Sequence, residues 1–338
     1  MISVKQNKKI FSTITNLDTY GGAEKVLMDV HNGIHDIYSA KILGFQNYEK
    51  LHPKHKVKKE EYIRFKNPFI LRNSIVLIHA RKLLPFFVIL NKLLFLKARL
   101  IYISHSVYST LKNFTLSPDE IVSISSGVTE NLINYFDIEK DRIRLINNGV
   151  KDIYSERSIR EYKEGGIIKI LYIGRVDKWK QQLKIVRNLR GKISSNIVIH
   201  FAGTGEDYEM LTKECLKSDT FKTLGFIENI NDLILEYDYV LLFSLKEGLP
   251  ISLLEAIMNA KPVLTNDVGG SLEMCVNNIN GFVIQDKWED LIDKINTLDS
   301  ILKDDYIKMS VSSRKIYLEK FTYELMIEKY IELIEKRT

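Results

Sequence analysis

The sequence predicts an α/β protein built from two doubly wound parallel-sheet domains that face each other across a cleft. Short apolar runs alternate with segments of helical period, and this alternation occurs in two successive series. A charged segment at residues 151–166 separates the two series, contains no apolar run and closes on two glycines, as linkers commonly do. The length of 338 residues is sufficient for two domains of ordinary size.

The first series begins with a strand expected at residues 9–15, followed by Gly21, Gly22 and a helix at 23–33. A strand, a glycine loop and a helix are how α/β sheets build ligand crevices at strand ends. A single loop of this kind is as often a simple turn. The other elements expected in this series are strands at 74–79, 100–105, 120–125 and 142–146 and a helix at 128–136.

Two histidines, His79 and His105, stand at the ends of two of these strands. A lone histidine is more often structural than catalytic. Two of them at the same kind of strand end, on the edge of a parallel sheet where ligands bind, favour a functional role.

Residues 81–97 are strongly apolar but carry basic residues at Arg81, Lys82, Lys92, Lys97 and, just beyond, Arg99. The apolar length falls short of a membrane span. The pattern favours a helix packed on the sheet. An interfacial helix on a membrane surface is the alternative, because basic residues flank the apolar ones. The preceding residues 50–73 are irregular and basic, which indicates a solvated loop or, second, a contact with an anionic surface.

The second series restarts the alternation. Its strands are expected at residues 167–173, 195–202, 222–226, 239–243, 262–265 and 281–284, and a final helix is expected at 322–336. The glycines at Gly203 and Gly205 follow a strand but do not form the G-x-G-x-x-G pattern, so dinucleotide binding gains little support.

The stretch from Glu247 to Glu255 carries the most chemical information. An apolar strand leads into Gly248 and Pro250, and a short helix is expected at residues 251–259, with Pro250 suited to its first turn. The N–H groups at such a helix start attract phosphate. Glu255 should lie about 7 Å along the helix. An anion at the helix start would therefore have a carboxylate on each side, which suits a nucleoside diphosphate joined to a sugar.

Arg175 and Lys180 follow a strand that ends in glycine. Alone, two such charges are more often solvated; together with the Glu247–Glu255 stretch, they favour neutralisation of a diphosphate. The sequence has no Asp-x-Asp pair, no zinc-like spacing of His, Cys and carboxylates, and no Walker pattern. We therefore expect no metal site, with phosphate charge handled by Arg, Lys and helix N-termini.

Composition constrains the setting of the protein. The formal net charge of +6 and the pI near 8.9 suit an anionic partner without selecting one. The two cysteines, Cys215 and Cys275, do not form a disulfide framework, and the first residues lack the apolar core of a signal peptide. The expected location is the cytoplasm, including the inner face of the cell membrane.

The chain resembles the retaining glycosyltransferases of family GT4, which have the GT-B fold of two Rossmann-like domains. The matching pieces fall in the family's order along nearly the whole chain: Gly21-Gly-Ala-Glu24, Ile78-His79-Ala80, Ile103-Ser-His105, Asn148-Gly-Val150, Gly174-Arg175 with Lys180, Gly203-Thr-Gly205, Glu247 to Glu255, and Gly269-Gly-Ser-Leu-Glu273. The resemblance implies an acceptor-binding domain at 1–158, a nucleotide-sugar-binding domain at 165–318, and a helix at 319–338 that crosses back to the first domain.

The resemblance also implies roles for individual residues. Glu247 would contact the donor sugar, His105 would contact the donor sugar near the reacting carbon, and Glu255 would contact the ribose. The donor-binding residues would be Gly22, Arg175, Lys180, Gly248, Leu249, Pro250, Ile251 and Glu255. Three positions depart from the family pattern: Gln181 replaces a usual glycine, Gly-Leu-Pro-Ile replaces Gly-Phe-Gly, and Ser106 follows His105.

The activity that the resemblance implies is metal-independent, retaining transfer from a UDP- or GDP-sugar, with no other cofactor. The acceptor would be a glycan or lipid-linked glycan of a bacterial cell-surface polysaccharide or lipopolysaccharide, and the lysine-flanked apolar segment suggests peripheral contact with an anionic membrane. The alternatives are a nucleotide-sugar 2-epimerase on the same fold, or a non-catalytic protein that binds nucleotide sugars or nucleic acid. No aromatic-plus-basic RNA motif is present, so no nucleic-acid partner is expected.

Overall fold

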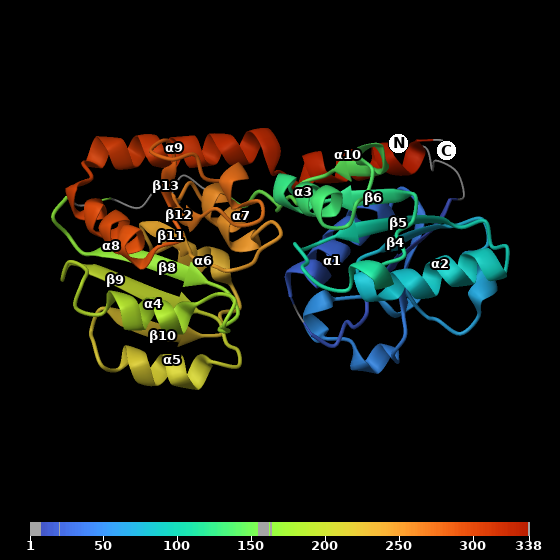
Figure 1. The fold of residues 1–338 in the computed structure, drawn as a ribbon, viewed down its shortest axis with the longest axis horizontal. Coiled ribbons are helices and arrows are strands. Elements are labelled where there is room, and N and C mark those ends of the chain that lie inside the picture. The colour runs from blue at the N-terminus through green and yellow to red at the C-terminus, as the bar shows by residue number, and fades with distance from the viewer. Residues whose placement is uncertain (1–7, 20, 155–161, 163, 337–338) are drawn as a thin grey trace. The chain divides into compact units, whose positions relative to one another are not determined.

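A computed structural model of the chain describes residues 8–19, 21–154, 162 and 164–336. The chain divides into two compact units. Unit 1 comprises Met1–Asn148 and Tyr323–Thr338, and unit 2 comprises Gly149–Thr322. The expected linker at 151–166 falls partly on residues 155–161 and 163, which lie outside the described residues. Figure 1 shows a layer of strands with helices around it in each unit.

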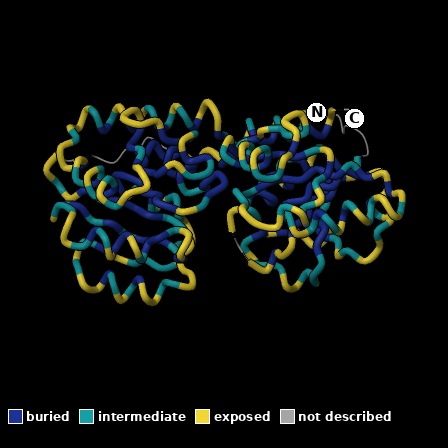
Figure 2. The backbone as a smooth tube through the Cα atoms, viewed as in Figure 1, coloured by how far each residue is buried: buried dark blue, intermediate teal, exposed yellow. Residues whose placement is uncertain are grey.

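In the described part of unit 1, seven parallel strands form one sheet in the order β3-β2-β1-β4-β5-β6-β7. Their bounds are β1 Lys9–Thr13, β2 Ser39–Gly44, β3 Tyr62–Arg64, β4 Ile75–Ile78, β5 Arg99–Ser104, β6 Glu120–Ser123 and β7 Ile143–Leu145. The central strands are buried on both faces (Figure 2), which is why they read as apolar runs rather than as alternating patterns. The order reverses between β1 and β4, and such a switch point is where open α/β sheets bind ligands.

The helices of unit 1 have apolar residues at helical spacing. Their bounds are α1 Gly22–His35, α2 Leu84–Leu93, α3 Ser126–Asn134 and α10 Tyr323–Glu335. Helix α1 buries Val26, Val30 and Ile34 on one face. Helix α10 packs against α1, where a Cβ atom on Gly33 would lie 2.3 Å from Cδ1 of Ile327. Glycine at position 33 therefore permits the close approach of the two helices.

In the described part of unit 2, six parallel strands form a second sheet in the order β10-β9-β8-β11-β12-β13. The strand bounds are β8 Ile168–Ile173, β9 Ile197–Ala202, β10 Phe221–Gly225, β11 Tyr239–Leu242, β12 Val263–Asn266 and β13 Gly281–Ile284. The helix bounds are α4 Gln182–Leu189, α5 Tyr208–Cys215, α6 Ile230–Leu235, α7 Ile251–Met258, α8 Trp288–Thr297 and α9 Lys303–Lys320. The order reverses between β8 and β11, so the loops that follow these two strands meet at the switch point.

The predicted fold class is confirmed: both sheets are parallel and doubly wound. Two strands were missed, β2 and β3. Strand β2 mixes polar and apolar residues and contains no long apolar run, and β3 has only three residues. The expected irregular region at 50–73 also contains 3-10 helices, among them η4 (Pro68–Leu71).

Residues 81–97 form a 3-10 turn, η5 (Arg81–Leu83), and helix α2. The helix buries Leu84 and Phe87, as expected for a helix packed on the sheet. Other apolar side chains in and after it remain exposed, namely Phe86, Ile89, Leu93 and Phe95. Among the described residues, no helix has the length and apolar composition needed to cross a membrane.

Candidate functional site

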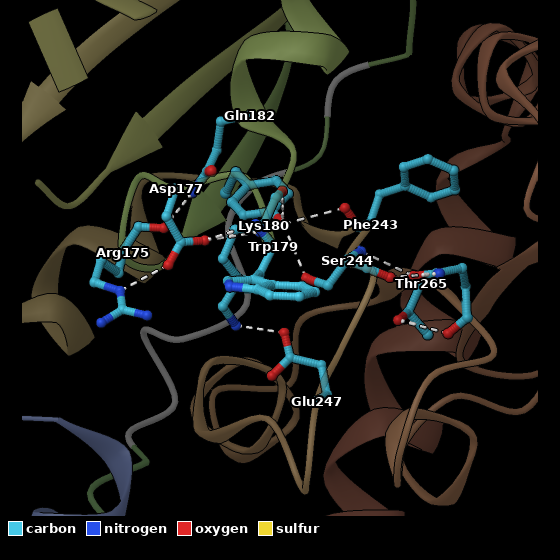
Figure 3. Close-up of polar contacts among 11 residues, drawn as sticks. Arg175, Asp177, Trp179, Lys180, Gln182, Phe243, Ser244, Glu247 and Thr265 are labelled. Carbon is cyan, nitrogen blue, oxygen red and sulfur yellow. Dashed lines mark hydrogen bonds and ion pairs between the residues drawn. The ribbon is translucent and has the colours of Figure 1, made fainter. Parts of the chain in front are cut away.

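The loop after β8 is organised by the buried carboxylate of Asp177 (Figure 3). Its oxygens accept hydrogen bonds from the backbone N–H groups of Trp179 and Lys180, each at 3.0 Å, and from Nε of Arg175 at 2.7 Å. A carboxylate that accepts from the backbone two residues ahead forms a tight turn. The Arg175 side chain is 73% exposed, so its terminal nitrogens remain accessible for a ligand.

Two glycines let a neighbouring loop approach this turn closely. Gly203 has a φ of +136°, and a Cβ atom there would lie 2.0 Å from the carbonyl oxygen of Gly174. A Cβ atom on Gly205 would lie 2.2 Å from the carbonyl oxygen of Val176. The backbone N–H of Val176 donates to the carbonyl of Thr204 at 3.0 Å. The glycine pair after β9 thus supports the loop that carries Arg175.

Lys180 connects the loop after β8 to the loop after β11. Its ammonium group forms an ion pair with Oε1 of Glu247, and its carbonyl accepts a hydrogen bond from the hydroxyl of Tyr172 at 2.6 Å. The side chains of Lys180 and Glu247 are 20% and 9% exposed. A second tie is the hydrogen bond from Leu245 N–H to the carbonyl of Trp179 at 2.8 Å. The cation and the carboxylate are therefore held in place before any ligand arrives.

Gln181, a departure from the family pattern, adopts a left-handed backbone with a φ of 59°. This is the conformation that glycine adopts without strain. The amide of Gln182 stabilises the same turn by donating to the carbonyl of Arg175 at 2.9 Å. The turn therefore keeps a glycine-like geometry in spite of the substitution.

The stretch after Glu247 has the predicted strand, turn and helix. Gly248, Leu249 and Pro250 are buried, and Pro250 precedes the first residue of α7, Ile251. The turn is packed from behind by a second glycine pair: Gly270 N–H donates to the carbonyl of Gly248 at 2.7 Å, and a Cβ atom on Gly269 would lie 2.6 Å from that oxygen. Glu255 lies inside α7 and is largely buried.

Eight of the ten predicted site residues belong to unit 2. At its switch point the structure brings Lys180 into contact with Glu247, beside Arg175 and the turn that begins at Gly248. Asp177 was not among the predicted site residues. Its position two residues before Trp179, in a loop that begins with glycine, was a signal for a side-chain-capped turn. The other two predicted residues, Gly22 and His105, belong to unit 1.

Gly22 is the first residue of α1 and is exposed. The residue before it, Gly21, caps the helix in an extended conformation and has no side chain to bond the first N–H groups. The start of α1 is therefore a place where backbone N–H groups can meet an anion.

His105 follows β5 and contacts His79, which follows β4. Nδ1 of His79 lies 2.9 Å from Nε2 of His105, and the two rings are inclined by only 19°. The backbone N–H of His79 donates to the carbonyl of Thr13 at the end of β1, at 2.8 Å. Burial lowers the pKa of His105 to about 4 and that of His79 well below its usual value, so both rings are neutral at pH 7.

Acid should weaken the folding of unit 1. Burial also lowers the pKa of His31 in α1 to about 4, whereas an unfolded histidine titrates near 6.5. The stabilising contribution of each neutral histidine is therefore complete above pH 6.5 and is lost as the pH falls toward 4. For His31 and His105, whose pKa values fall to about 4, the linkage relation gives roughly 2 kcal/mol each between pH 7.5 and 5.

Urea unfolding at the two pH values measures this loss. His31→Leu should make the dependence on pH shallower, because one titrating group is gone. An unfolding free energy that is equal at pH 7.5 and pH 5 would contradict the assignment of these histidines as neutral in the folded protein.

Residues 155–312 match the family Glycosyl transferases group 1. These residues are similar to the group 1 glycosyltransferases. The switch-point residues of unit 2, including Arg175, Lys180 and Glu247, lie within the matched range.

Curated relatives of the chain are glycosyltransferases. The chain is 29% identical over 188 residues to the O-antigen biosynthesis glycosyltransferase WbnH of Escherichia coli, covering 54% of this chain and 52% of WbnH. It is 27% identical over 201 residues to the lipopolysaccharide 1,6-galactosyltransferase of Escherichia coli K12, covering 54% of this chain and 50% of that protein. The matches thus span about half the length of these relatives.

Solved structures match nearly the whole chain. Anabaena HepE in complex with UDP and glucose has a TM-score of 0.82 at 17% identity, with 98% of this chain and 100% of HepE covered. A glycosyltransferase from Rickettsia africae has a TM-score of 0.79 at 20% identity, with 97% of each chain covered. At this identity the likeness concerns the fold, which is GT-B.

Proposed function

We propose that the chain is a retaining glycosyltransferase that moves a sugar from a nucleoside-diphosphate sugar to a glycan acceptor. The observation that carries the proposal is the Lys180–Glu247 ion pair at the switch point of unit 2. It places a cation for the diphosphate beside a carboxylate that can accept hydrogen bonds from sugar hydroxyls. Arg175, on the same turn, adds a second cation with a planar fork.

These side chains suit a reaction in which negative charge develops on a leaving diphosphate. Fixed cations stabilise such charge without reorganising during the reaction. In the mechanism we propose, the leaving phosphate accepts the acceptor's proton and the sugar is transferred on the same face, so that its configuration is retained. Glu247 is paired with Lys180 and would contact the donor sugar rather than attack it. A covalent glycosyl adduct trapped on Glu247 would contradict this mechanism.

The roles of the remaining residues follow the family resemblance. We propose that Glu255 accepts hydrogen bonds from the ribose, that Gly248 to Ile251 line the donor-binding turn, that Gly22 lies near the donor phosphates, and that His105 contacts the donor sugar. Because Arg175 and Lys180 supply the positive charge, activity should not need a divalent metal and should survive EDTA.

The donor is proposed to be a UDP- or GDP-sugar. The structure of HepE, which holds UDP and glucose, supports this class of ligand on the same fold. A thermal-shift screen with UDP, GDP and their sugar conjugates tests the proposal, because a ligand at 100 times its Kd adds about 2.7 kcal/mol of stability. Stabilisation by one nucleotide series is the expected result. No shift with any of these nucleotides would argue against a nucleotide-sugar site.

The acceptor is proposed to be a glycan of a bacterial cell-surface polysaccharide or lipopolysaccharide. Two relatives support this class by their names: an O-antigen biosynthesis glycosyltransferase and a lipopolysaccharide 1,6-galactosyltransferase. An assay with donor alone separates transfer from epimerisation, because an epimerase changes the sugar of the donor without an acceptor. Conversion of the donor sugar in that assay would contradict the proposal.

A lipid-linked acceptor would bring the enzyme to the cytoplasmic face of a membrane, and the α2 surface has the chemistry for peripheral contact. We define the α2 surface as the exposed apolar residues Phe69, Phe86, Ile89, Leu93 and Phe95 with the exposed basic residues Lys66, Arg72, Lys82, Lys92 and Lys97. Residues 62–118 contain nine Lys or Arg and no Asp or Glu. Apolar side chains ringed by cations suit the interface of an anionic bilayer.

The structure refines which basic residues can serve this contact. Arg99 is paired with Glu120, and Arg81 donates to the carbonyl of Thr110 at 2.6 Å, so both are used inside unit 1. Residues 73 and 96 are joined by a backbone hydrogen bond of 3.0 Å, which places the end of η4 beside the turn after α2. In that turn, Phe95 and Lys97 both have left-handed backbones.

Flotation with vesicles of phosphatidylcholine and phosphatidylglycerol tests the membrane contact. Wild-type protein should float with the anionic vesicles and be released as salt is raised. Leu93→Ser combined with Phe95→Ser should abolish flotation. The matched control is Leu216→Ser, which replaces a leucine of unit 2 that is 83% exposed. This variant should float like wild type. Failure of wild type to float on anionic vesicles would remove this part of the proposal.

A further inference from the structure

We propose that His79 is a positioning residue for His105. It donates its Nδ1–H to Nε2 of His105 and so keeps the proton of His105 on Nδ1. In this tautomer His105 presents a hydrogen-bond donor, rather than an acceptor, to a bound ligand. The tautomer follows from the contacts of the two rings within unit 1; its use in binding the donor sugar rests on the proposed function.

The main chain fixes the geometry of the pair. Strands β4 and β5 are neighbours, with Ile78 opposite Tyr102, and His79 is the next residue after β4. Its backbone N–H is held by the carbonyl of Thr13 on the other side, at the switch point of the sheet. His79 is buried and cannot move away from His105 without breaking these contacts.

Only one hydrogen atom can lie between the two nitrogens that are 2.9 Å apart. If His79 donates from Nδ1, its Nε2 carries a lone pair. If His105 donates from Nε2, the proton of His79 must lie on its own Nε2 instead, because a neutral imidazole has one N–H. The two arrangements therefore differ at Nε2 of His79, which carries a lone pair in the first and a proton in the second.

Nε2 of His79 is buried and has no hydrogen-bond partner among the described residues. A buried N–H without an acceptor is rarer in proteins than an acceptor that lacks a donor. The arrangement in which Nε2 of His79 carries the lone pair is therefore favoured, and His79 is the donor. The low pKa values of both rings agree with a neutral pair that shares a single hydrogen bond.

The consequence for His105 is a defined donor. Its Nε2 accepts from His79, so its own proton is on Nδ1, because the bond at one ring nitrogen decides the protonation of the other. Across the described part of the chain, Nδ1 of His105 has no hydrogen-bond partner, and it is not among the fully buried atoms. An Nδ1–H in that position fits an oxygen that accepts, such as a sugar hydroxyl or a phosphate oxygen.

The test is the tautomer of His105, read by long-range ¹H–¹⁵N NMR of the full chain labelled on its histidines. In wild type without ligand, His105 should show a protonated Nδ1 and a hydrogen-bonded, unprotonated Nε2. A protonated Nε2 on His105 would overturn the proposal. This spectrum needs no substrate, so failure of the glycosyltransferase proposal would leave its answer unchanged.

Two variants separate a positioning role from a packing role. In His79→Asn the side-chain amide can donate from near the position of Nδ1, and the Nδ1–H form of His105 should persist. In His79→Leu the donor is gone, and the signal of His105 should move to the Nε2–H form or to a mixture. An unchanged His105 tautomer in folded His79→Leu would contradict the proposal.

Turnover gives the second readout. His79→Leu should lower kcat by about 10-fold, which is the lower end of the effects of residues that orient a functional histidine, with a smaller change in the KM for the donor. His79→Asn should restore most of kcat. Equal kcat values in the two variants, with both folded, would show that the hydrogen bond has no positioning role. Should His79→Leu not fold, the wild-type spectrum still decides the tautomer.

Discussion

Replacing Lys180 with alanine is expected to weaken the binding of a nucleoside diphosphate by about 100-fold, the effect of losing a hydrogen bond between charged groups. Two physical effects act in the same direction. The ammonium that would contact the diphosphate is removed. Glu247, whose side chain is 9% exposed, loses its cation and repels an incoming anion. Calorimetric titration with UDP or GDP, whichever stabilises wild type more, measures the loss.

Lys178→Ala is the matched control for this substitution. Lys178 lies in the same loop, is exposed, and has its ammonium 5.3 Å from the ring centroid of Trp179. Its removal changes the net charge by the same amount but leaves the ion pair with Glu247 in place, so affinity should change by less than about threefold. If Lys180→Ala bound the nucleotide as tightly as Lys178→Ala, the assignment of Lys180 to the diphosphate would be wrong.

Much of this site could be predicted because its signals are local. The apolar runs that became β8 and β11 are buried on both faces, and each is followed by a glycine turn that a single sequence reveals. The start of α7 after Pro250 is likewise encoded within a few residues. The charged residues could be placed on these turns without knowledge of the rest of the fold.

The partners of those residues could not be predicted, because they depend on which strands become neighbours. The Lys180–Glu247 pair joins residues that are 67 positions apart, through the adjacency of β8 and β11. The His79–His105 contact needs β4 and β5 side by side. The missed strand β2 pairs with β1, and only that pairing shows that β1 is central rather than an edge.

Local backbone conformation also could not be predicted from the sequence pattern. The glutamine at position 181 gave no reason to expect a left-handed turn. The turn forms because Asp177 accepts two backbone N–H groups just before it and because Tyr172 holds the carbonyl of Lys180. Tertiary contacts thus stabilise a conformation that the residue itself disfavours by roughly 1 kcal/mol.

The largest effect on stability is expected from Gly203→Ala, which should destabilise unit 2 by at least about 3 kcal/mol. The new Cβ atom would lie 2.0 Å from the carbonyl oxygen of Gly174, at a φ of +136° that side chains rarely adopt. Neither backbone can yield easily, because Gly203 N–H donates to the carbonyl of Gly225 at 2.7 Å and Gly174 N–H donates to Ala202 at 3.0 Å.

Gly191→Ala separates backbone strain from collision in this prediction. Gly191 also has a positive φ, +71°, but no heavy atom within 4 Å of the added Cβ, so its substitution should cost only about 1 kcal/mol. Urea unfolding measures the stability of both variants. Equal losses of unfolding free energy would show that the close approach of Gly203 to Gly174 does not add to the destabilisation. Because Gly174 precedes Arg175, any folded Gly203→Ala protein should also bind the nucleotide more weakly than folded Gly191→Ala. Weaker binding by that variant would show that the diphosphate site also depends on the glycine behind the loop.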